Sequence, residues 1–369
     1  MRTKKKTYFR LIIDKFMKRR LSQLGLALVI LMMFVAIAAP FLASDKPYYY
    51  MDGDKLTFPI LSEIHALRSV KEWRYPEYDN VEFRKLALDS NQTLLMPPIP
   101  FSPTEYDLDA MLTPPGREHV MGTDVQGRDI ASRMIHGTKV SLSVGFIAVG
   151  IYVFLGLIIG SIAGFFGGWV DLAISRVIEI VMCFPTFFLI LTVLALVGPN
   201  ENLLIVLLKR MTDSDFLIEW AEWLVSFAEP SLFNMMLVIG VTGWTGIARL
   251  VRGEFLKLKN QDFVQSAHVL GYRTLRIIFR HILPNAVSPV LVSVTFGIAS
   301  AILVESSLSF LGFGVHPPTP SWGDILSQSR EFMDIAWWLM FYPGVAIFLT
   351  VTALNLVGEG LRDAIDPRV

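Results

Sequence analysis

The sequence predicts an all-α membrane protein that crosses the bilayer several times. Its 369 residues are 53% hydrophobic and only 18% charged, whereas ordinary soluble domains carry about 25% charged residues. The mean hydropathy is +0.50. The apolar residues are gathered in long continuous runs, which favour helices, because the strands of a membrane β-barrel appear as alternating segments of about ten residues.

Six apolar runs are long enough to cross a membrane, since a helix needs about 20 residues to span roughly 30 Å of hydrocarbon. Within hydrocarbon the backbone hydrogen bonds must close inside the segment, which a helix achieves. The expected transmembrane helices are Leu21–Leu42, Val140–Phe166, Leu172–Val197, Leu232–Val251, Ala286–Leu308 and Trp337–Val357.

Charge sets the expected orientation. Residues 1–20 carry nine Lys or Arg against one acid, and such basic flanks stay in the cytoplasm. Six crossings then place both termini in the cytoplasm, together with the loop 252–284, where six basic side chains face two acidic ones. Residues 21–42 exceed the 7–15 apolar residues typical of a signal peptide, so we expect an uncleaved first helix.

Two segments are expected on the outer side. Residues 43–138 include a long stretch rich in Asp, Glu, Pro and Tyr, which fits either a folded cap or an irregular lid. In the insertion 198–231, polar residues recur every three or four positions from Asp215 to Glu229. An acid on every turn is too costly for a crossing. A helix at the outer interface and a helix packed on the outer loop are both open interpretations.

The loop 252–284 has a helical pattern of its own. Asp262 is a suitable N-cap for a short helix over Phe263–Leu270. Gly271 follows at the place where a left-handed residue ends a helix. We therefore expect a short helix that projects into the cytoplasm and ends in a glycine elbow.

A second, amphipathic helix is expected after this elbow, with Thr274 as its cap. Its apolar residues recur at helical spacing, at Leu275, Ile278, Phe279 and Ile282. Its opposite face carries three cations suited to lipid phosphates, Arg273, Arg276 and Arg280. We expect this helix to lie along the membrane and to end at Pro284, because proline breaks helices.

The first of these helices resembles a known motif. Phe263–Gly271 (FVQSAHVLG) is similar to the EAA motif of ABC importer permeases, in which an acid, two alanines and a later glycine are typical. Ala267 and Gly271 match, whereas Gln265 stands at the acid position and Ser266 at the first alanine. Further blocks resemble the second, C-type permease of the dipeptide/oligopeptide/nickel family. These blocks are Gly122–Gly145, Cys183–Leu191, Glu305–Leu326 and Trp337–Arg368.

The resemblance implies a type I importer permease fold in the bacterial inner membrane, with a core in 139–369 and a family block in 122–138. It implies a heterodimer with a sister permease, two ATP-binding subunits that hold ATP and Mg, and an external solute-binding protein that delivers peptide. Membrane lipid completes the expected partners. The residues expected to couple to an ATPase are Asp262, Phe263, Gln265, Ser266, Ala267, His268, Leu270 and Gly271.

The sequence also bears on other classes of protein. It holds no G-x-x-x-x-G-K-[ST], H-E-x-x-H or G-x-S-x-G motif, so we expect no enzyme, no cofactor or metal in this chain and no nucleic-acid partner. Its one cysteine, Cys183, lies in an apolar run and is expected to be buried.

The alternative function is an ion-coupled secondary transporter or channel, which usually needs charge near the bilayer centre. The deepest acid, Glu179, has Arg176 as a partner three residues away.

Two groups of small residues invite close packing of helices. The first recurs every four residues, at Gly156, Gly160, Gly164 and Gly168, and packing within this subunit is favoured over packing against a partner. The second group lies in the fourth crossing, at Gly240, Thr242, Gly243, Thr245 and Gly246, together with Trp244. A polar translocation route and simple packing are both open for the second group.

Overall fold

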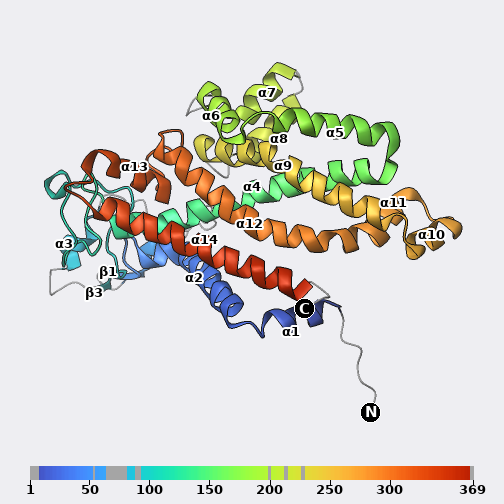
Figure 1. Cartoon of the computed structure of the whole chain (residues 1–369). Coiled ribbons are helices and arrows are strands. Elements are labelled where there is room, and N and C mark those ends of the chain that lie inside the picture. The colour runs from blue at the N-terminus through green and yellow to red at the C-terminus, as the bar shows by residue number, and fades with distance from the viewer. Residues whose placement is uncertain are drawn as a thin grey trace, which may run out of the picture. The chain divides into compact units, whose positions relative to one another are not determined.

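The computed structural model describes residues 8–52, 55–63, 81–87, 93–197, 201–211, 215–225 and 229–365. Within these ranges the chain is mainly helical (Figure 1). It divides into two compact units. The first unit comprises Met1–Val29, Ser143–Glu305 and Leu349–Val369, and the second unit comprises Ile30–Leu142 and Ser306–Phe348.

Five helices in the described ranges are long and apolar enough to cross a membrane. They are α2 (Arg20–Leu42), α4 (Ile130–Phe166), α9 (Pro230–Leu258), the continuous helix Thr274–Phe310 and α14 (Trp338–Ile365). These helices confirm the first, second, fourth, fifth and sixth predicted crossings. All five extend beyond the predicted bounds at one end or both, because hydropathy detects the apolar part and not the polar turns that continue it.

The third predicted crossing, Leu172–Val197, is bent rather than straight. It forms α5 (Gly168–Met182) and α6 (Thr186–Val197), which meet at 78°. Pro185 stands directly before α6, and the residue before a proline avoids helical backbone. If the pair is one span, the described part of the chain has up to six. Cys183 lies in the bend and is exposed, so the prediction of a buried cysteine is wrong.

Close packing of α4 on α9 organises the first unit, and Figure 1 shows the two helices side by side. A Cβ at Gly156 would lie 2.6 Å from Cβ of Ile247, and one at Gly160 would lie 2.5 Å from the carbonyl oxygen of Ala248. Gly164 is equally close to Phe255. Packing within this subunit is therefore confirmed for three of the four glycines.

The second group of small residues contributes to the same contact. A Cβ at Gly240 would lie 2.6 Å from Cβ of Ile151, and one at Gly243 would lie 2.8 Å from the ring of Tyr152. Both partners belong to α4. The packing interpretation is therefore confirmed for these two glycines, whereas Gly246 has no heavy atom within 4 Å of such a Cβ.

The insertion after α6 forms α7 (Leu203–Met211) and α8 (Asp215–Val225), which pack on each other. Glu222 of α8 pairs with Lys209 of α7 at 3.6 Å, and Phe216 and Trp220 are exposed. The predicted acid-bearing helix is therefore present. Asn234 of α9 anchors the start of the insertion, since its side chain accepts a hydrogen bond from the Leu203 amide at 2.9 Å.

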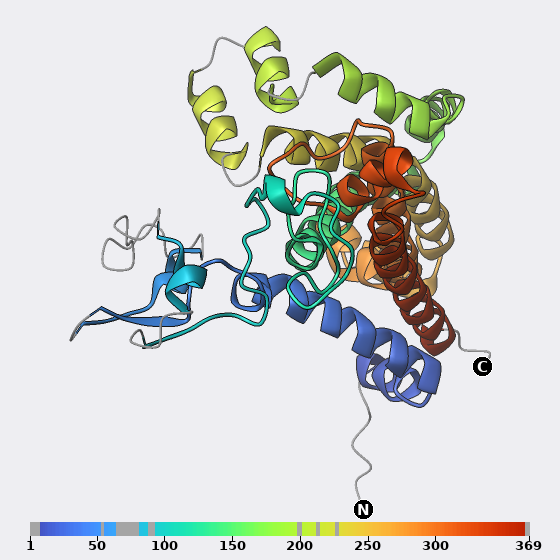
Figure 2. The same cartoon turned by 90° about the vertical axis from the view of Figure 1, so that its left-hand side faces the viewer.

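The second unit contains a small sheet that the sequence did not predict. β1 (Tyr49–Asp52) pairs antiparallel with both β2 (Lys55–Thr57) and β3 (Thr93–Leu95). Tyr50 of β1 meets Phe83 of α3 (Phe83–Ala87) edge to face, with ring centroids 5.4 Å apart, and Figure 2 shows α3 in cyan beside the strands. The described part of residues 43–138 therefore contains folded structure and is not irregular throughout.

Shorter elements complete the two units. They are α1 (Tyr8–Phe16), the 3-10 turns Pro59–Glu63 and Leu108–Ala110, α10 (Asp262–Val269), α11 (Thr274–Ile277), the π-helical turn Ile278–Ile282, α12 (Leu283–Phe310) and α13 (Trp322–Phe332).

Candidate functional site

The predicted coupling residues lie together on α10 and on the turn that ends it. The N-cap is Gln261, whose backbone is extended (φ −80°, ψ 152°), and Asp262 is the first helical residue. The predicted cap is therefore wrong by one residue, a shift typical of helix ends, where the cap and the first turn differ little in sequence preference. At its actual position, the carboxylate of Asp262 still interacts favourably with the positive end of the helix dipole.

The two faces of α10 differ in burial. Val264 and Ala267 are buried and only 0% and 2% exposed, and α10 packs against α11 and the π-helical turn. The other face is exposed and includes large apolar side chains, with Leu270 69% and Val269 88% accessible. The remaining predicted coupling residues are also exposed, namely Asp262, Phe263, Gln265, Ser266, His268 and Gly271.

Gly271 ends α10 as predicted. Its φ is +73°, in the left-handed region that glycine adopts without strain. The Gly271 amide donates to the carbonyl of His268 at 2.9 Å, and the Tyr272 amide donates to the carbonyl of Ala267 at 3.2 Å. These two bonds satisfy carbonyls that a helix end leaves without partners.

The predicted break at Pro284 is absent. α11 continues through the π-helical turn into α12, and Thr274–Phe310 forms one helix of 37 residues. Arg273, and not Thr274, is its N-cap. The π-helical turn changes the hydrogen bonding before the proline, because the Leu283 amide donates to the carbonyl of Ile278, five residues back.

This continuity also corrects the prediction of a separate helix along the membrane. The amphipathic segment is the first part of the fifth crossing itself. Asn285 contributes to the join, since its side-chain amide donates to the carbonyl of His281 at 2.8 Å. α10 is therefore joined, through the turn Leu270–Arg273, to one continuous helix that includes α12.

Contacts of α10 and the end of α9 with other helices hold this region in place. The ring of His268 stacks on Phe165 of α4, with centroids 6.4 Å apart. Lys259 donates to the carbonyl of Gly164 at 3.1 Å. Arg252 of α9 forms a two-pronged ion pair with Asp171 of α5, in which Nη2 lies 2.8 Å from Oδ2 and Nε forms the other bond.

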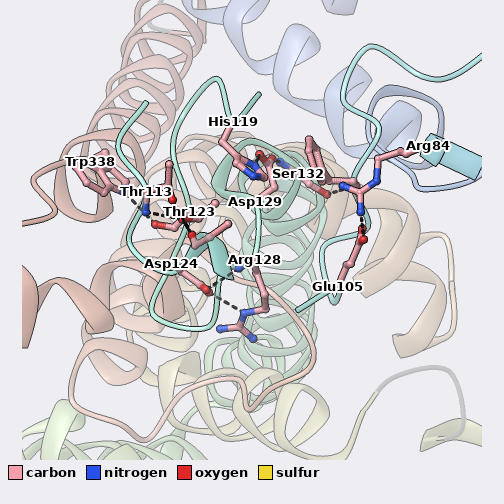
Figure 3. Close-up of polar contacts among 12 residues, drawn as sticks. Arg84, Glu105, Thr113, His119, Thr123, Asp124, Arg128, Asp129, Ser132 and Trp338 are labelled. Atoms are coloured by element: carbon pink, nitrogen blue, oxygen red, sulfur yellow. Dashed lines mark hydrogen bonds and ion pairs between the residues drawn. The ribbon is translucent and has the colours of Figure 1, made fainter. Parts of the chain in front are cut away.

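A second polar cluster lies in the second unit, at the loop before α4 (Figure 3). The carboxylate of Asp124 accepts hydrogen bonds from the amides of Gln126 and Arg128 at 2.8 and 2.9 Å, and from Nε of Arg128 at 2.7 Å. Arg133 lies 3.6 Å from the same carboxylate and forms an ion pair with Asp324 of α13. We call Asp124, Arg128, Arg133 and Asp324 the external ion network, because the sequence predicts residues 43–138 on the outer side.

The residue that begins α4 has its own set of partners. Asp129 accepts a hydrogen bond from the Ser132 amide at 2.7 Å, as an N-cap does, and its other oxygen lies 2.9 Å from Nδ1 of His119. The hydroxyl of Ser132 donates to the carbonyl of Phe101 at 2.8 Å. Arg84 stacks on the Phe101 ring and pairs with Glu105. The start of α4 is thus tied to the loop around Phe101.

Thr123 connects the same loop to α14. Its hydroxyl accepts from the amide of Thr113 at 2.8 Å, and its carbonyl accepts from the indole N–H of Trp338 at 3.0 Å. Gly122 has a φ of +78°, and a Cβ there would lie 2.7 Å from the Thr113 carbonyl oxygen. This close approach leaves room for glycine only.

Because its charges are buried, breaking an ion pair of the external ion network is expected to lower the stability of the fold. The side chains of Asp124, Arg128 and Arg133 are at most 2% exposed, and removing one partner from such a pair typically costs about 3–5 kcal/mol. Burial also raises the pKa of Asp324, and the positive charge of Arg133 opposes that rise. The arrangement is a largely buried set of ion pairs that joins the loop before α4 to α13. Among the described residues, no group of His, Cys, Asp and Glu side chains is arranged to hold a metal ion.

In the sequence, the block Gly122–Gly145 is recognisable only by its resemblance to the permease family, and its pattern predicts no role for its charges. Arg133 and its partner Asp324 are 191 residues apart, so no local pattern joins them. One signal was available: Asp124 and Arg128 are four residues apart and stand directly before a long apolar run.

The helical architecture, with several spans and few charges inside them, defines a polytopic membrane protein. Comparison with known families makes this specific. The chain belongs to the family of binding-protein-dependent transport system inner membrane components, whose model matches residues 156–369. A second model, the N-terminal TM domain of oligopeptide transport permease C, matches residues 7–59. The protein is thus a multi-pass permease of the bacterial inner membrane and not an enzyme.

Relatives cover most of the chain. It is 37% identical over 255 residues to the dipeptide transport system permease protein DppC of Alkalihalophilus pseudofirmus, covering 69% of this chain and 74% of that relative. It is 39% identical over 276 residues to DppC of Haemophilus influenzae, covering 73% and 83%. A solved structure of the MetNI methionine ABC transporter, in an inward-facing conformation, is 14% identical, has a TM-score of 0.46 and covers 64% of this chain and 98% of that chain.

Proposed function

We propose that this chain is one permease subunit of an ATP-driven peptide importer. We further propose that α10 binds an ATPase subunit and couples its movement to the permease. Support for the peptide substrate comes from the names of two relatives, which are dipeptide permeases, and from the oligopeptide permease model that matches the N-terminal part. The pathway forms between this chain and a sister permease. Two ATP-binding subunits hold ATP and Mg, and an external solute-binding protein delivers peptide.

In the proposed topology both termini are cytoplasmic. Residues 1–20 form a basic cytoplasmic tail, 21–42 the first crossing, 43–138 an external segment and 139–369 the core. Within the core, 198–231 is external and 252–284 is the cytoplasmic coupling loop. The basic excess of residues 1–20 and of the coupling loop supports this orientation.

One observation carries the coupling role. α10 and the turn that ends it expose three large apolar side chains that lie close together in the sequence, Phe263, Val269 and Leu270. Exposed apolar side chains grouped in this way mark a surface that a protein partner covers. The proposed docking face consists of Phe263, Gln265, Ser266, His268 and Leu270, and the acid of Asp262 begins the helix.

Two of the proposed coupling residues act by position rather than by contact with the ATPase. Ala267 is buried, and its small side chain lets α10 pack closely on α11. Gly271 provides the left-handed elbow that fixes the direction of α10. Movement of the docked ATPase then passes to α4 through the His268–Phe165 stack and to α12 through α11.

Docking is tested with the Leu270→Asp variant. Leu270 is exposed, so the substitution leaves the fold intact but places a charge in the proposed interface. We expect the ATPase subunits to be lost during purification of the complex and nucleotide-driven peptide uptake to fall to background. Met211→Asp is the matched control, because Met211 of α7 is 81% exposed and lies outside the docking face. Equal ATPase recovery in both variants would contradict the docking role.

The elbow is tested separately with Gly271→Pro. Proline fixes φ near −65° and removes the amide that bonds to His268, so both parts of the cap are lost. We expect normal membrane insertion but no coupled uptake. The control is Gly253→Ala, a glycine of α9 with open space around it. Peptide uptake at the wild-type rate in Gly271→Pro would overturn the elbow's role.

The alternative function, an ion-coupled transporter or channel, predicts uptake without nucleotide. The Arg176–Glu179 pair, at 2.6 Å, is the candidate on which that alternative depends. Uptake in vesicles that hold an ion gradient but no nucleotide would favour the alternative. We expect none.

A further inference from the structure

A cavity of about 390 Å³ lies in the second unit, between the start of α4 and the segments that precede it. Most of its lining is apolar and includes Met96, Ile99, Phe101 and Val120, and the rest is charged. Pockets for small ligands have volumes of about 300–1,000 Å³ and combine an apolar lining with a few polar groups. The size and the lining of this cavity therefore fit a small organic ligand.

The apolar wall of the cavity is held by contacts within the chain. The guanidinium carbon of Arg84 lies 4.3 Å from the centroid of the Phe101 ring, and the centroid of the His119 ring lies 4.5 Å from it. The backbone amide of Ile99 donates to the carbonyl of Leu42 at 3.2 Å. These contacts involve no ligand, so the wall is preformed.

Two of the four charged lining residues already have partners in the fold. Arg84 forms an ion pair with Glu105. Asp129 accepts from the Ser132 amide with one carboxylate oxygen and contacts His119 with the other. Figure 3 shows Arg84 beside Glu105 and His119 beside Asp129. The charges of Arg84 and Asp129 are therefore largely compensated within the chain.

The other two charged lining residues, Arg117 and Glu118, are exposed. In the described part of the chain, neither side chain forms a hydrogen bond or an ion pair. They are adjacent in the sequence, carry opposite charges and line the same apolar cavity. A ligand with a carboxylate, an ammonium group and an apolar side chain matches all three features, whereas a fatty acid has no ammonium group for Glu118.

We propose that this cavity binds a short peptide with free termini and an apolar side chain. The peptide carboxylate pairs with Arg117, its ammonium group pairs with Glu118, and the apolar side chain packs on the lining around Phe101 and Val120. The choice of a peptide over a free amino acid rests on the proposed function. In the proposed topology the cavity belongs to the external segment, so peptide is held on the permease itself before it enters the pathway.

The apolar lining and the two charges contribute differently to this binding. Burial of an apolar side chain supplies most of the affinity, because ion pairs at exposed positions are weak. The charges of Arg117 and Glu118 instead set the selectivity for free termini. Capping both termini of the peptide is therefore expected to weaken binding by up to about five-fold for each charge that is lost.

The test compares free dileucine with dileucine that is acetylated at its N-terminus and amidated at its C-terminus. Dissociation constants are measured by saturation-transfer NMR on the purified importer complex, without its solute-binding protein and without nucleotide. We expect the wild type to bind free dileucine more tightly than the capped form. Arg117→Gln/Glu118→Gln is expected to bind both forms with the weaker affinity of the capped peptide, and Val120→Gln is expected to weaken both forms alike.

The matched control is Glu82→Gln/Lys85→Gln. It also removes one exposed anion and one exposed cation of the second unit, but both lie outside the cavity, so the preference for free peptide is expected to remain. Equal affinity of the wild type for the two forms, or the same loss of preference in both double variants, would overturn the proposal. Leucine binding as tightly as dileucine would overturn the choice of a peptide.

This result is separable from that of the proposed function, because the assay uses no nucleotide and measures no transport. Peptide uptake that needs no nucleotide would overturn the proposed function and leave the binding result standing. The outcomes that overturn the peptide site leave the coupling role of α10 untouched.

Discussion

α10 in the first unit and the external ion network in the second unit are both polar stretches beside a spanning helix, yet they are built in opposite ways. α10 exposes most of its side chains and is held by a glycine cap, one ring stack and its packing on α11. The external ion network buries its charges and pairs each carboxylate with an arginine. In the proposed function the exposed face of α10 is left for a partner, whereas the external ion network is built from contacts within this chain.

The largest expected effect comes from the external ion network. Arg133→Met leaves the carboxylate of Asp324 without its ion-pair partner in a buried place, which we expect to cost about 3–5 kcal/mol. The measurement is the melting temperature of the purified protein in detergent. Arg176→Met is the control, because the Arg176–Glu179 pair is 67% and 60% exposed and such pairs contribute about 0–1 kcal/mol. Similar melting temperatures for the two variants would contradict the proposed difference in stability between the buried and the exposed ion pair.

A smaller effect is expected where the first unit depends on glycine packing. A Cβ at Gly160 meets the backbone of Ala248 at 2.5 Å, so Gly160→Val forces α4 and α9 apart at a cost of about 1–3 kcal/mol. The same melting measurement checks it. Gly150→Val on the same helix has open space around it and is expected to be tolerated. A loss of stability only at position 150 would show that α9 does not pack on this face.

Gly271→Ala is expected to have a modest and local effect. Alanine at a φ of +73° costs about 1–2 kcal/mol, while a Cβ there meets no other atom. The strain weakens the two capping bonds, so hydrogen exchange at Gly271 and Tyr272 should speed up by roughly five- to thirty-fold. The melting temperature of the whole protein should change little. Unchanged exchange at both amides would show that the elbow is not held by its cap.

Much of this fold is legible in the sequence because apolar runs and glycine have direct physical meaning. Leu21–Leu42 is apolar apart from Ser22 and Gln23 and forms α2 nearly residue for residue. Gly271 follows a short helical pattern and adopts the left-handed conformation that such a position requires. The bend at Pro185 escaped prediction because the apolar run continues through it, so hydropathy reports one segment where the backbone forms two.

Other features depend on residues far apart in the chain. The Arg133–Asp324 pair joins α4 to α13, and neither residue has a local pattern that names the other. The strands β1 to β3 have at most four residues each, too short for an alternating pattern to stand out. The continuity through Pro284 depends on a π-helical turn, for which the sequence carries no recognised signal.

The smallest expected effect is a dependence of stability on pH. Burial and the nearby charge of Glu63 raise the pKa of Asp45 above 3.8 in the folded second unit. The folded state therefore favours the protonated carboxyl, and this group's contribution to stability is lost as pH rises through the raised pKa. Asp45→Asn should melt higher than the wild type near neutral pH, and the difference should vanish below pH 3.8. A difference that grows as pH falls would contradict this sign.

The central claim is that α10 binds an ATPase subunit and couples its movement to the permease. A cross-link at the docking face tests this claim most directly. Because Cys183 is the only cysteine, a Cys183→Ser background allows a single Leu270→Cys probe in the reconstituted importer. We predict that this probe cross-links to an ATP-binding subunit and that the cross-link blocks nucleotide-driven peptide uptake. Labelling of the probe only from the outer side of the membrane, or full uptake in the cross-linked importer, would contradict the account.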